Sequence, residues 1–212
     1  MLVVHHLENS RSQRILWMLE ELQFDYELHR YKRNRDMTAP VELKNVHPLG
    51  KSPAVEDRLA DGKSMVLVET GAICEYLVEK AGGQLGPGAR SEEKRRYRQF
   101  LHYAEGSVMP VLFAVLVASK VPVLGRFASK KVRPMPDVHL NYIEAELSSR
   151  DWFAGDRLTA ADIMMSFPLE AARSRGGLQK RYAATIKWLD RIHNRPAYRQ
   201  ALTRGGNYAF SA

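Results

Sequence analysis

The chain has 212 residues, 45% of them hydrophobic, which is enough to bury a sizeable core in one or two domains. Its 32 Lys and Arg residues exceed the 24 Asp and Glu residues and give a formal net charge of +8. A basic chain raises nucleic acid as a partner, but these residues are scattered among acids and match no nucleic-acid motif, so we expect none. The single cysteine, Cys74, excludes an intramolecular disulfide and hence a stapled secreted scaffold.

The N-terminus and the apolar runs indicate the cellular location of the protein. Residues 1–8 lack the basic segment and the long apolar run of a signal peptide. The longest apolar run, Val108 to Ala118, has 11 residues and contains Pro110, whereas a membrane-spanning helix needs about 20. The sequence therefore predicts a soluble, cytoplasmic protein without a membrane partner.

Residues 1–80 show the pattern of a small α/β domain. An apolar strand at residues 2–4 precedes a helix on which Ile15, Leu19 and Leu22 recur at helical spacing. The other elements expected here are a half-buried strand at 24–28, a short helix at 40–46, strands at 54–57 and 65–68, and a helix at 70–80. The order β-α-β-α-β-β-α predicts a parallel βαβ unit, then a hairpin and a covering helix.

After the Gly-rich segment 82–88 the pattern is helical throughout. Thr159 and Asp162 form a capping-box pattern, with Leu158 and Ile163 placed to make an apolar contact across the helix start. The charge balance also changes at this segment, because residues 1–85 hold 11 basic and 13 acidic residues and residues 86–212 hold 21 and 11. We expect an α/β domain over residues 1–82 and an all-helical domain over residues 89–212. Helical stripes in this part comprise Tyr97, Leu101, Ala104 and Val108, then Leu140, Ile143 and Leu147, and finally Tyr182, Ile186 and Leu189.

The first strand-to-helix turn gathers polar side chains where an anion binds well. Asn9, Ser10 and Ser12 place an amide, hydroxyls and backbone N–H groups at a helix N-terminus, which favours a phosphate, a carboxylate or a thiolate. The structural alternative is that Asn9 or Ser10 only caps the helix.

Two further segments indicate a peptide-like ligand. If the Ser52-Pro53 bond before a strand is cis, the Ser52 N–H and C=O face outward and can pair with an extended backbone. At the next helix start, Glu69 can take an ammonium group and Thr70 a carboxylate, as at the two ends of an amino-acid zwitterion. An ordinary loop and an ordinary helix cap are the alternatives for these two segments.

Taken in order, these features resemble the glutathione S-transferase family from Leu2 to about Tyr198. The resemblance implies a thioredoxin-like N-terminal domain, a helical-bundle C-terminal domain, glutathione as co-substrate and a homodimer. The resemblance rests on four motifs: the turn 9–12 with Arg14 and the helix 16–22, the Asn-x-x-Pro-x-Gly-Lys-x-Pro loop over residues 45–53, the pair Glu69-Thr70, and the capping segment 158–163.

The resemblance also assigns roles by position. Ser10 lies four residues before Arg14, where serine-type classes place the catalytic hydroxyl, while Asn9 and Ser12 stay open as alternatives. The first turn holds neither a tyrosine nor a cysteine, which argues against catalysis of those two types. The expected glutathione-binding residues are His47 and Lys51 for the glycine carboxylate, Ser52 and the cis-proline Pro53 for the cysteinyl backbone, Glu69 and Thr70 for the γ-glutamyl end, and Glu105 for the partner subunit's ligand.

The chemistry that this arrangement predicts is ionisation of a bound thiol. A free thiol has a pKa of about 8.5, and a hydroxyl donor with a helix dipole favours the thiolate, so neither a metal nor a general base is needed. His5 and His6 point to opposite faces of their strand and cannot chelate one metal, and Cys74 is expected to be buried and inert.

We therefore expect a glutathione transferase whose thiolate attacks an electrophilic centre on an apolar co-substrate. The co-substrate pocket is expected to include Leu7, Met109 and Phe113, the last of them in the apolar run 111–117. The alternatives are a glutathione-dependent reductase of peroxides or disulfides and a non-catalytic interaction module on the same fold.

Overall fold

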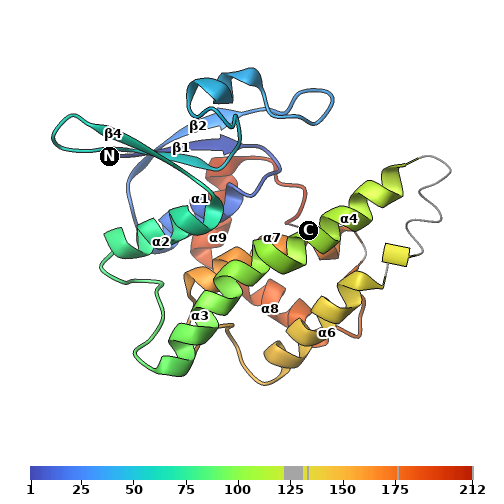
Figure 1. Cartoon of the computed structure of the whole chain (residues 1–212). Coiled ribbons are helices and arrows are strands. Elements are labelled where there is room, and N and C mark those ends of the chain that lie inside the picture. The colour runs from blue at the N-terminus through green and yellow to red at the C-terminus, as the bar shows by residue number, and fades with distance from the viewer. Residues whose placement is uncertain (122–130, 133, 176, 212) are drawn as a thin grey trace. The chain divides into compact units, whose positions relative to one another are not determined.

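The computed structural model describes residues 1–121, 131–132, 134–175 and 177–211. Their contacts divide into two compact units, one of Met1–Gly86 with His193–Ser211 and the other of Pro87–Ile192. Figure 1 shows the strands in the first unit and helices in the second, so the expected α/β plus all-α fold class is confirmed. The division by sequence put residues 193–211 with the helical domain, whereas in the structure they pack with the α/β unit.

The first unit is built on a four-stranded mixed sheet in the order β2-β1-β3-β4. β1 (Leu2–Leu7) pairs with β2 (Tyr26–Tyr31) in parallel and with β3 (Ala54–Arg58) antiparallel, and β4 (Ser64–Val68) pairs antiparallel with β3. All six residues of β1 are buried, as expected for an interior strand. The predicted βαβ unit and hairpin are both present.

β2 starts later than the sequence pattern indicates, at Tyr26 instead of Phe24. The preceding helix, α1 (Gln13–Leu22), is followed by Gln23, which adopts a left-handed conformation with φ 55°. The Phe24 N–H then donates to the Leu19 carbonyl at 3.0 Å, the bond that closes a Schellman-type helix end. Phe24 therefore belongs to the end of the helix, and the strand begins where Tyr26 pairs with Leu2.

The helices of the first unit include the C-terminal one. They are α1 (Gln13–Leu22), the short 3₁₀ helix η1 (Val41–Asn45), α2 (Thr70–Lys80) and α9 (Pro196–Gly205). α9 packs on α1, where the rings of Trp17 and Tyr198 meet edge to face at 5.4 Å.

Ion pairs fasten both ends of α9 to α1. Arg195 Nε lies 2.5 Å from Glu21 Oε1, and Arg204 Nη1 lies 3.1 Å from Glu20 Oε1. Glu21 is largely buried, so its two contacts with the Arg195 guanidinium are shielded from solvent better than a surface pair would be. This packing explains why the last helix belongs to the α/β unit.

The second unit consists of helices among the residues described. They are α3 (Ser91–Tyr103), the π-type turn η2 (Ala104–Val108), α4 (Met109–Lys120), α6 (Met135–Ser148), α7 (Ala160–Ser174) and α8 (Ala183–His193), whose last residue falls in the first unit. The stretch Ser91–Lys120 runs unbroken through α3, η2 and α4, and by length and composition alone it would suffice to cross a membrane, a property shared by core helices of soluble proteins.

The central helix α7 begins with the capping box that the sequence predicts. The Asp162 carboxylate accepts the Thr159 N–H and the Phe153 N–H, each at 2.9 Å, and the Thr159 hydroxyl as well. Residues 160–172 are buried, so this helix forms the core of the unit.

Candidate functional site

The turn between β1 and α1 holds the three polar residues that the sequence singles out. Ser12 is the residue at the N-cap position of α1, and its side chain makes no capping hydrogen bond. The capping alternative is wrong for Asn9, which lies before the helix start, whereas Ser10 does accept the Ser12 N–H at 3.2 Å as a capping side chain would. Asn9 adopts φ 51°, a left-handed conformation that asparagine tolerates better than most residues.

The three side chains differ in their access to a ligand. Ser12 is fully buried, and its hydroxyl lies 2.8 Å from His6 Nδ1. Ser10 is 5% exposed, with its Oγ 2.7 Å from Ser12 Oγ and accepting the Ser12 N–H at 3.2 Å. Asn9 is half-buried, and its Oδ1 accepts the Ala209 N–H at 2.7 Å. Ser10 and Asn9 thus lie nearer the surface, and Ser12 lies behind them.

The peptide between Ser52 and Pro53 is cis, as the resemblance implies. The Ser52 hydroxyl donates to the His5 carbonyl at 2.8 Å and accepts the Leu7 N–H at 3.1 Å. Because these two bonds fix the hydroxyl against β1, Ser52 has its backbone rather than its side chain to offer to a ligand. The same bonds tie the proline loop to the end of β1, next to the turn that carries Ser10.

The start of α2 carries the expected acid and hydroxyl. Glu69 is exposed and adopts φ 70°, a conformation that is costly for a residue with a side chain and is found mainly where a site requires it. Thr70 is buried, and its Oγ1 accepts a hydrogen bond from Arg14 Nη2 at 3.2 Å. Since a guanidinium can only donate, the Thr70 proton stays available for an acceptor such as a carboxylate.

His47 and Lys51 lie in the loop before the cis peptide. His47 is half-buried, and its Nδ1 accepts the Leu49 N–H at 3.3 Å. Lys51 is exposed and has no hydrogen-bond or ion-pair partner among the described residues. Gly50 turns the chain between them with φ 57°, and a Cβ there would lie 2.8 Å from Lys44 Cγ.

The remaining predicted residues are divided between the two units. Leu7 ends β1 and is 3% exposed, while Met109 at the start of α4 is 5% exposed. Phe113 on α4 is 58% exposed, and Glu105 in η2 is half-buried. That Leu7, Met109 and Phe113 line one pocket stays a prediction.

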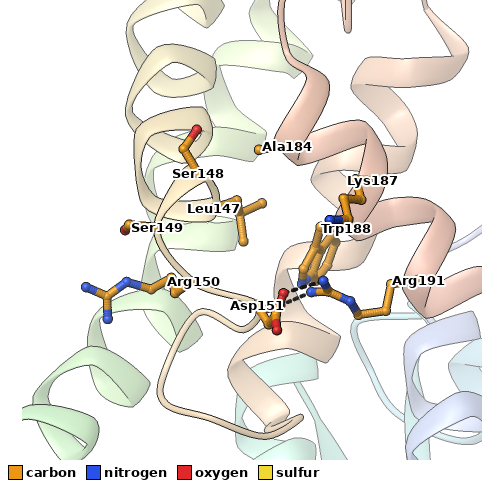
Figure 2. A pocket seen from close by; sticks show the side chains of 9 residues that line it. All are labelled: Leu147, Ser148, Ser149, Arg150, Asp151, Ala184, Lys187, Trp188 and Arg191. Carbon is orange, nitrogen blue, oxygen red and sulfur yellow. Dashed lines mark hydrogen bonds and ion pairs between the residues drawn. The ribbon is translucent and has the colours of Figure 1, made fainter.

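The described residues of the second unit also line a cavity of about 320 Å³ between α6 and α8. Figure 2 shows Leu147 and Trp188 within it and an ion pair between Asp151 and Arg191 at one end. None of the predicted site residues lines this cavity, and its mostly polar and charged wall does not suit an apolar co-substrate. No cluster of three or more metal-ligating side chains occurs in the part of the chain that the structure describes.

Sequence reasoning missed two contacts behind the first turn. The sequence analysis considers His6 only as a metal ligand and names no partner for it, whereas in the structure it is 2% exposed and bonded to Ser12. Asn9 is held by Ala209 of the C-terminal segment, 200 positions away in the sequence. The residue pattern of β1 and its following turn gives no local signal for either contact.

Comparisons with known proteins relate this chain to one family. Residues 1–79 match the family model described as glutathione S-transferase, N-terminal domain, and residues 108–196 match that of the C-terminal domain. Glutathione S-transferase 3 of Schizosaccharomyces pombe is 38% identical over 95% of this chain and 86% of its own length. Glutathione S-transferase 1 of Saccharomyces cerevisiae is 34% identical over 92% and 91%. A crystal structure of a glutathione S-transferase from Actinobacillus pleuropneumoniae superposes with TM-score 0.86 at 31% identity and covers 99% of this chain and 94% of that one.

Proposed function

The chain belongs to the glutathione S-transferase family and is a glutathione transferase, and we propose that three segments of its first unit bind and activate its co-substrate glutathione. The segments are the turn 9–12, the Ser52-Pro53 loop and the Glu69-Thr70 helix start. Hydrogen bonds connect them: Ser52 is bonded to the end of β1, and Arg14 of α1 is bonded to Thr70 of α2. This connection is the observation that carries the proposal.

The peptide part of glutathione is held by groups of matching charge. Glu69 takes the γ-glutamyl ammonium, and the Thr70 hydroxyl, with its proton left free by Arg14, donates to the adjoining carboxylate at the positive end of α2. The backbone of Ser52, beside Pro53, pairs with the cysteinyl residue. In the loop before it, His47 and Lys51 meet the glycine carboxylate.

The thiol is activated by a hydrogen bond to its charged form. We assign this role to Ser10, because Ser12 is fully buried behind it and Ser10 lies four residues before Arg14, where the serine-type classes place the hydroxyl. The side-chain amide of Asn9 is the alternative donor. A hydroxyl donating to sulfur near the positive end of α1 stabilises the thiolate over the thiol. The thiolate then attacks an electrophilic carbon of the co-substrate, forms the C–S bond and displaces the leaving group.

The co-substrate is a small apolar electrophile, since the pocket residues proposed are Leu7, Met109 and Phe113. Conjugation of such compounds in the cytoplasm is a detoxification reaction. In the proposed homodimer, Glu105 reaches the γ-glutamyl amine bound by the partner subunit.

The test combines binding with a substrate screen. Calorimetry should show glutathione binding with a dissociation constant in the micromolar to millimolar range, as is usual for a tripeptide held by polar contacts. A panel of apolar electrophiles should then yield glutathione conjugates, while hydroperoxides and disulfides in the same panel examine the reductase alternative. Ser10→Ala tests the assigned thiol contact in the same assays. Its control is Ser64→Ala, which removes an exposed hydroxyl of β4 in the same unit. Absence of binding at 10 mM glutathione (roughly tenfold a 1 mM dissociation constant) would contradict the proposal.

A further inference from the structure

An arginine from the loop after β2 holds the turn that carries Ser10. Arg33 Nε donates to the Glu8 carbonyl at 3.1 Å, and its Nη2 donates to the Asn9 carbonyl, also at 3.1 Å. Its Nη1 donates to the Met37 carbonyl at 2.8 Å, which ties the same guanidinium to its own loop. The side chain thus bonds two consecutive carbonyls of the first turn, a geometry that suits the planar fork of a guanidinium.

The position of Arg33 follows from the parallel pairing of β1 with β2. Leu7 at the end of β1 pairs with Tyr31 at the end of β2, and the Glu8 N–H continues this ladder by donating to the Tyr31 carbonyl at 3.0 Å. Two residues later, the Arg33 N–H donates to Glu8 Oε1 at 2.9 Å. Arg33 is therefore fixed beside the first turn by its backbone as well as by its side chain.

The guanidinium brings a positive charge to this turn. Arg33 is half-buried and forms no ion pair with a residue that the structure describes, since the Glu8 carboxylate accepts its backbone N–H instead. Burial lowers the pKa of Arg33, with a smaller raising effect of Glu8 and a smaller lowering effect of Arg11. An arginine nevertheless keeps its proton in any ordinary buffer, so a partly buried cation lies against the Asn9 carbonyl.

The same bond sets the direction of the Ser10 N–H. The Asn9–Ser10 peptide is trans, so its C=O and its N–H point in opposite directions. Because the Asn9 carbonyl faces Arg33, the Ser10 N–H points away from Arg33. Ser10 is 5% exposed, and its N–H has no hydrogen-bond partner in the part of the chain that the structure describes. Buried backbone N–H groups are nearly always paired, so this donor requires an acceptor from a ligand.

The glutathione sulfur is an acceptor that fits this donor. In the proposed function the sulfur binds at the Ser10 hydroxyl, and the backbone N–H belongs to the same residue. A hydrogen bond to a thiolate favours the charged form and lowers the pKa of the thiol. A cation bonded to the carbonyl of a peptide strengthens donation by the N–H at its other end, because hydrogen bonds in a chain polarise one another.

We propose that Arg33 is a positioning residue of the transferase reaction, which acts through the Asn9–Ser10 peptide to aim the Ser10 N–H at the glutathione sulfur and so favours the thiolate. The inference rests on the proposed function in one respect, namely that the sulfur binds at Ser10. It adds a second donor beside the Ser10 hydroxyl, and it names a residue outside the ligand contacts that controls this donor.

The test is the apparent pKa of bound glutathione in Arg33→Met, measured by thiolate absorbance and by the pH profile of kcat/KM. We expect this pKa to rise by roughly one unit, the equivalent of one hydrogen bond. Below that pKa, kcat/KM should fall by up to roughly tenfold, and it should recover as the pH rises. Arg35→Met is the matched control, because it removes an exposed arginine of the same loop, and it should change neither quantity.

Two further measurements separate positioning from a loss of structure. S-methylglutathione has no ionisable thiol, so its affinity reports the contacts with the peptide part alone. In Arg33→Met its dissociation constant should stay within about twofold of the wild-type value in calorimetry. In the Ser10→Ala background, Arg33→Met should raise the pKa of bound glutathione again by a similar amount, because alanine keeps the backbone N–H.

The outcomes distinguish this inference from the proposed function. If the wild type does not bind glutathione, the proposed function fails and the inference fails with it. If the wild type binds and ionises glutathione but Arg33→Met leaves the pKa unchanged, only the positioning role of Arg33 is overturned. Weaker binding of S-methylglutathione together with a raised pKa would also overturn it, because a purely structural arginine has that effect.

A second variant serves if Arg33→Met does not fold. Arg33→Lys keeps the charge and lacks the planar fork that bonds Glu8 and Asn9 together. It should raise the pKa of bound glutathione and leave the affinity for S-methylglutathione unchanged, with Arg35→Lys as its control. An Arg33→Lys protein with the wild-type pKa would overturn the inference.

Discussion

The buried histidine of β1 should make the protein lose stability in acid, and the size of the loss follows from its environment. Burial lowers the pKa of His6 from its ordinary 6.5 to about 4. In the unfolded chain His6 therefore binds a proton as the pH falls below 6.5, whereas in the folded chain it does so only near pH 4. The stabilisation is fully present above pH 6.5 and is lost as the pH falls towards 4.

The magnitude is large enough to measure. The full difference between the two pKa values corresponds to about 3 kcal/mol, of which about 2 kcal/mol is already lost at pH 5. His6→Asn removes the titrating group, so its own stability should lack this component. We expect the free energy of unfolding of the wild type, minus that of His6→Asn, to fall by about 2 kcal/mol between pH 7 and pH 5.

Urea unfolding of both proteins at several pH values, followed by circular dichroism, measures this difference. Taking the difference cancels the titration of the other acidic groups, as long as they do not contact His6. A difference that stays constant from pH 7 to pH 5 would refute the reasoning, because it would mean that His6 binds its proton equally well in the folded and unfolded chains. A difference that grows in acid would mean that the folded state prefers the charged ring.

Other predictions concern the ligand site and the C-terminal helix. Ser10→Ala should raise the apparent pKa of bound glutathione by about one to two units with little change in affinity, and activity should recover as the pH rises; an unchanged thiolate titration would move the role to Asn9. Glu69→Ala should weaken glutathione binding by at least ~1.5 kcal/mol in calorimetry, because the ligand ammonium loses its partner, and an unchanged affinity would contradict the assignment. Arg195→Ala should destabilise the first unit by about 1–3 kcal/mol, since it leaves the largely buried Glu21 without its guanidinium, whereas the exposed Arg98→Ala should have little effect in the same urea titration. Light scattering at micromolar concentration should give twice the chain mass of 24.1 kDa, and a mass near 24.1 kDa would contradict the homodimer.

The local parts of this protein were predictable because short-range chemistry specifies them. The Thr159 and Asp162 capping box needs only residues within one helical turn, and the structure forms it as the sequence predicts. The proline of the cis peptide and the order of strands and helices in residues 1–80 are likewise properties of short segments. The family resemblance rests on the same segments, and the comparisons confirm it.

Only the tertiary structure decided which distant segments meet. Pattern and spacing put α9 among the helices that follow residue 89. In the structure, two partly buried ion pairs with Glu20 and Glu21 and the contact of its Tyr198 with Trp17 hold it on α1 of the other unit. In the same way, His6 looks like any strand histidine until Gly205 approaches its Nε2, and that approach depends on the absence of a side chain about 200 positions along the chain. Alternation and helical spacing report which face of an element is buried and do not report what buries it, because the partner is set by the fit of side chains across the whole fold.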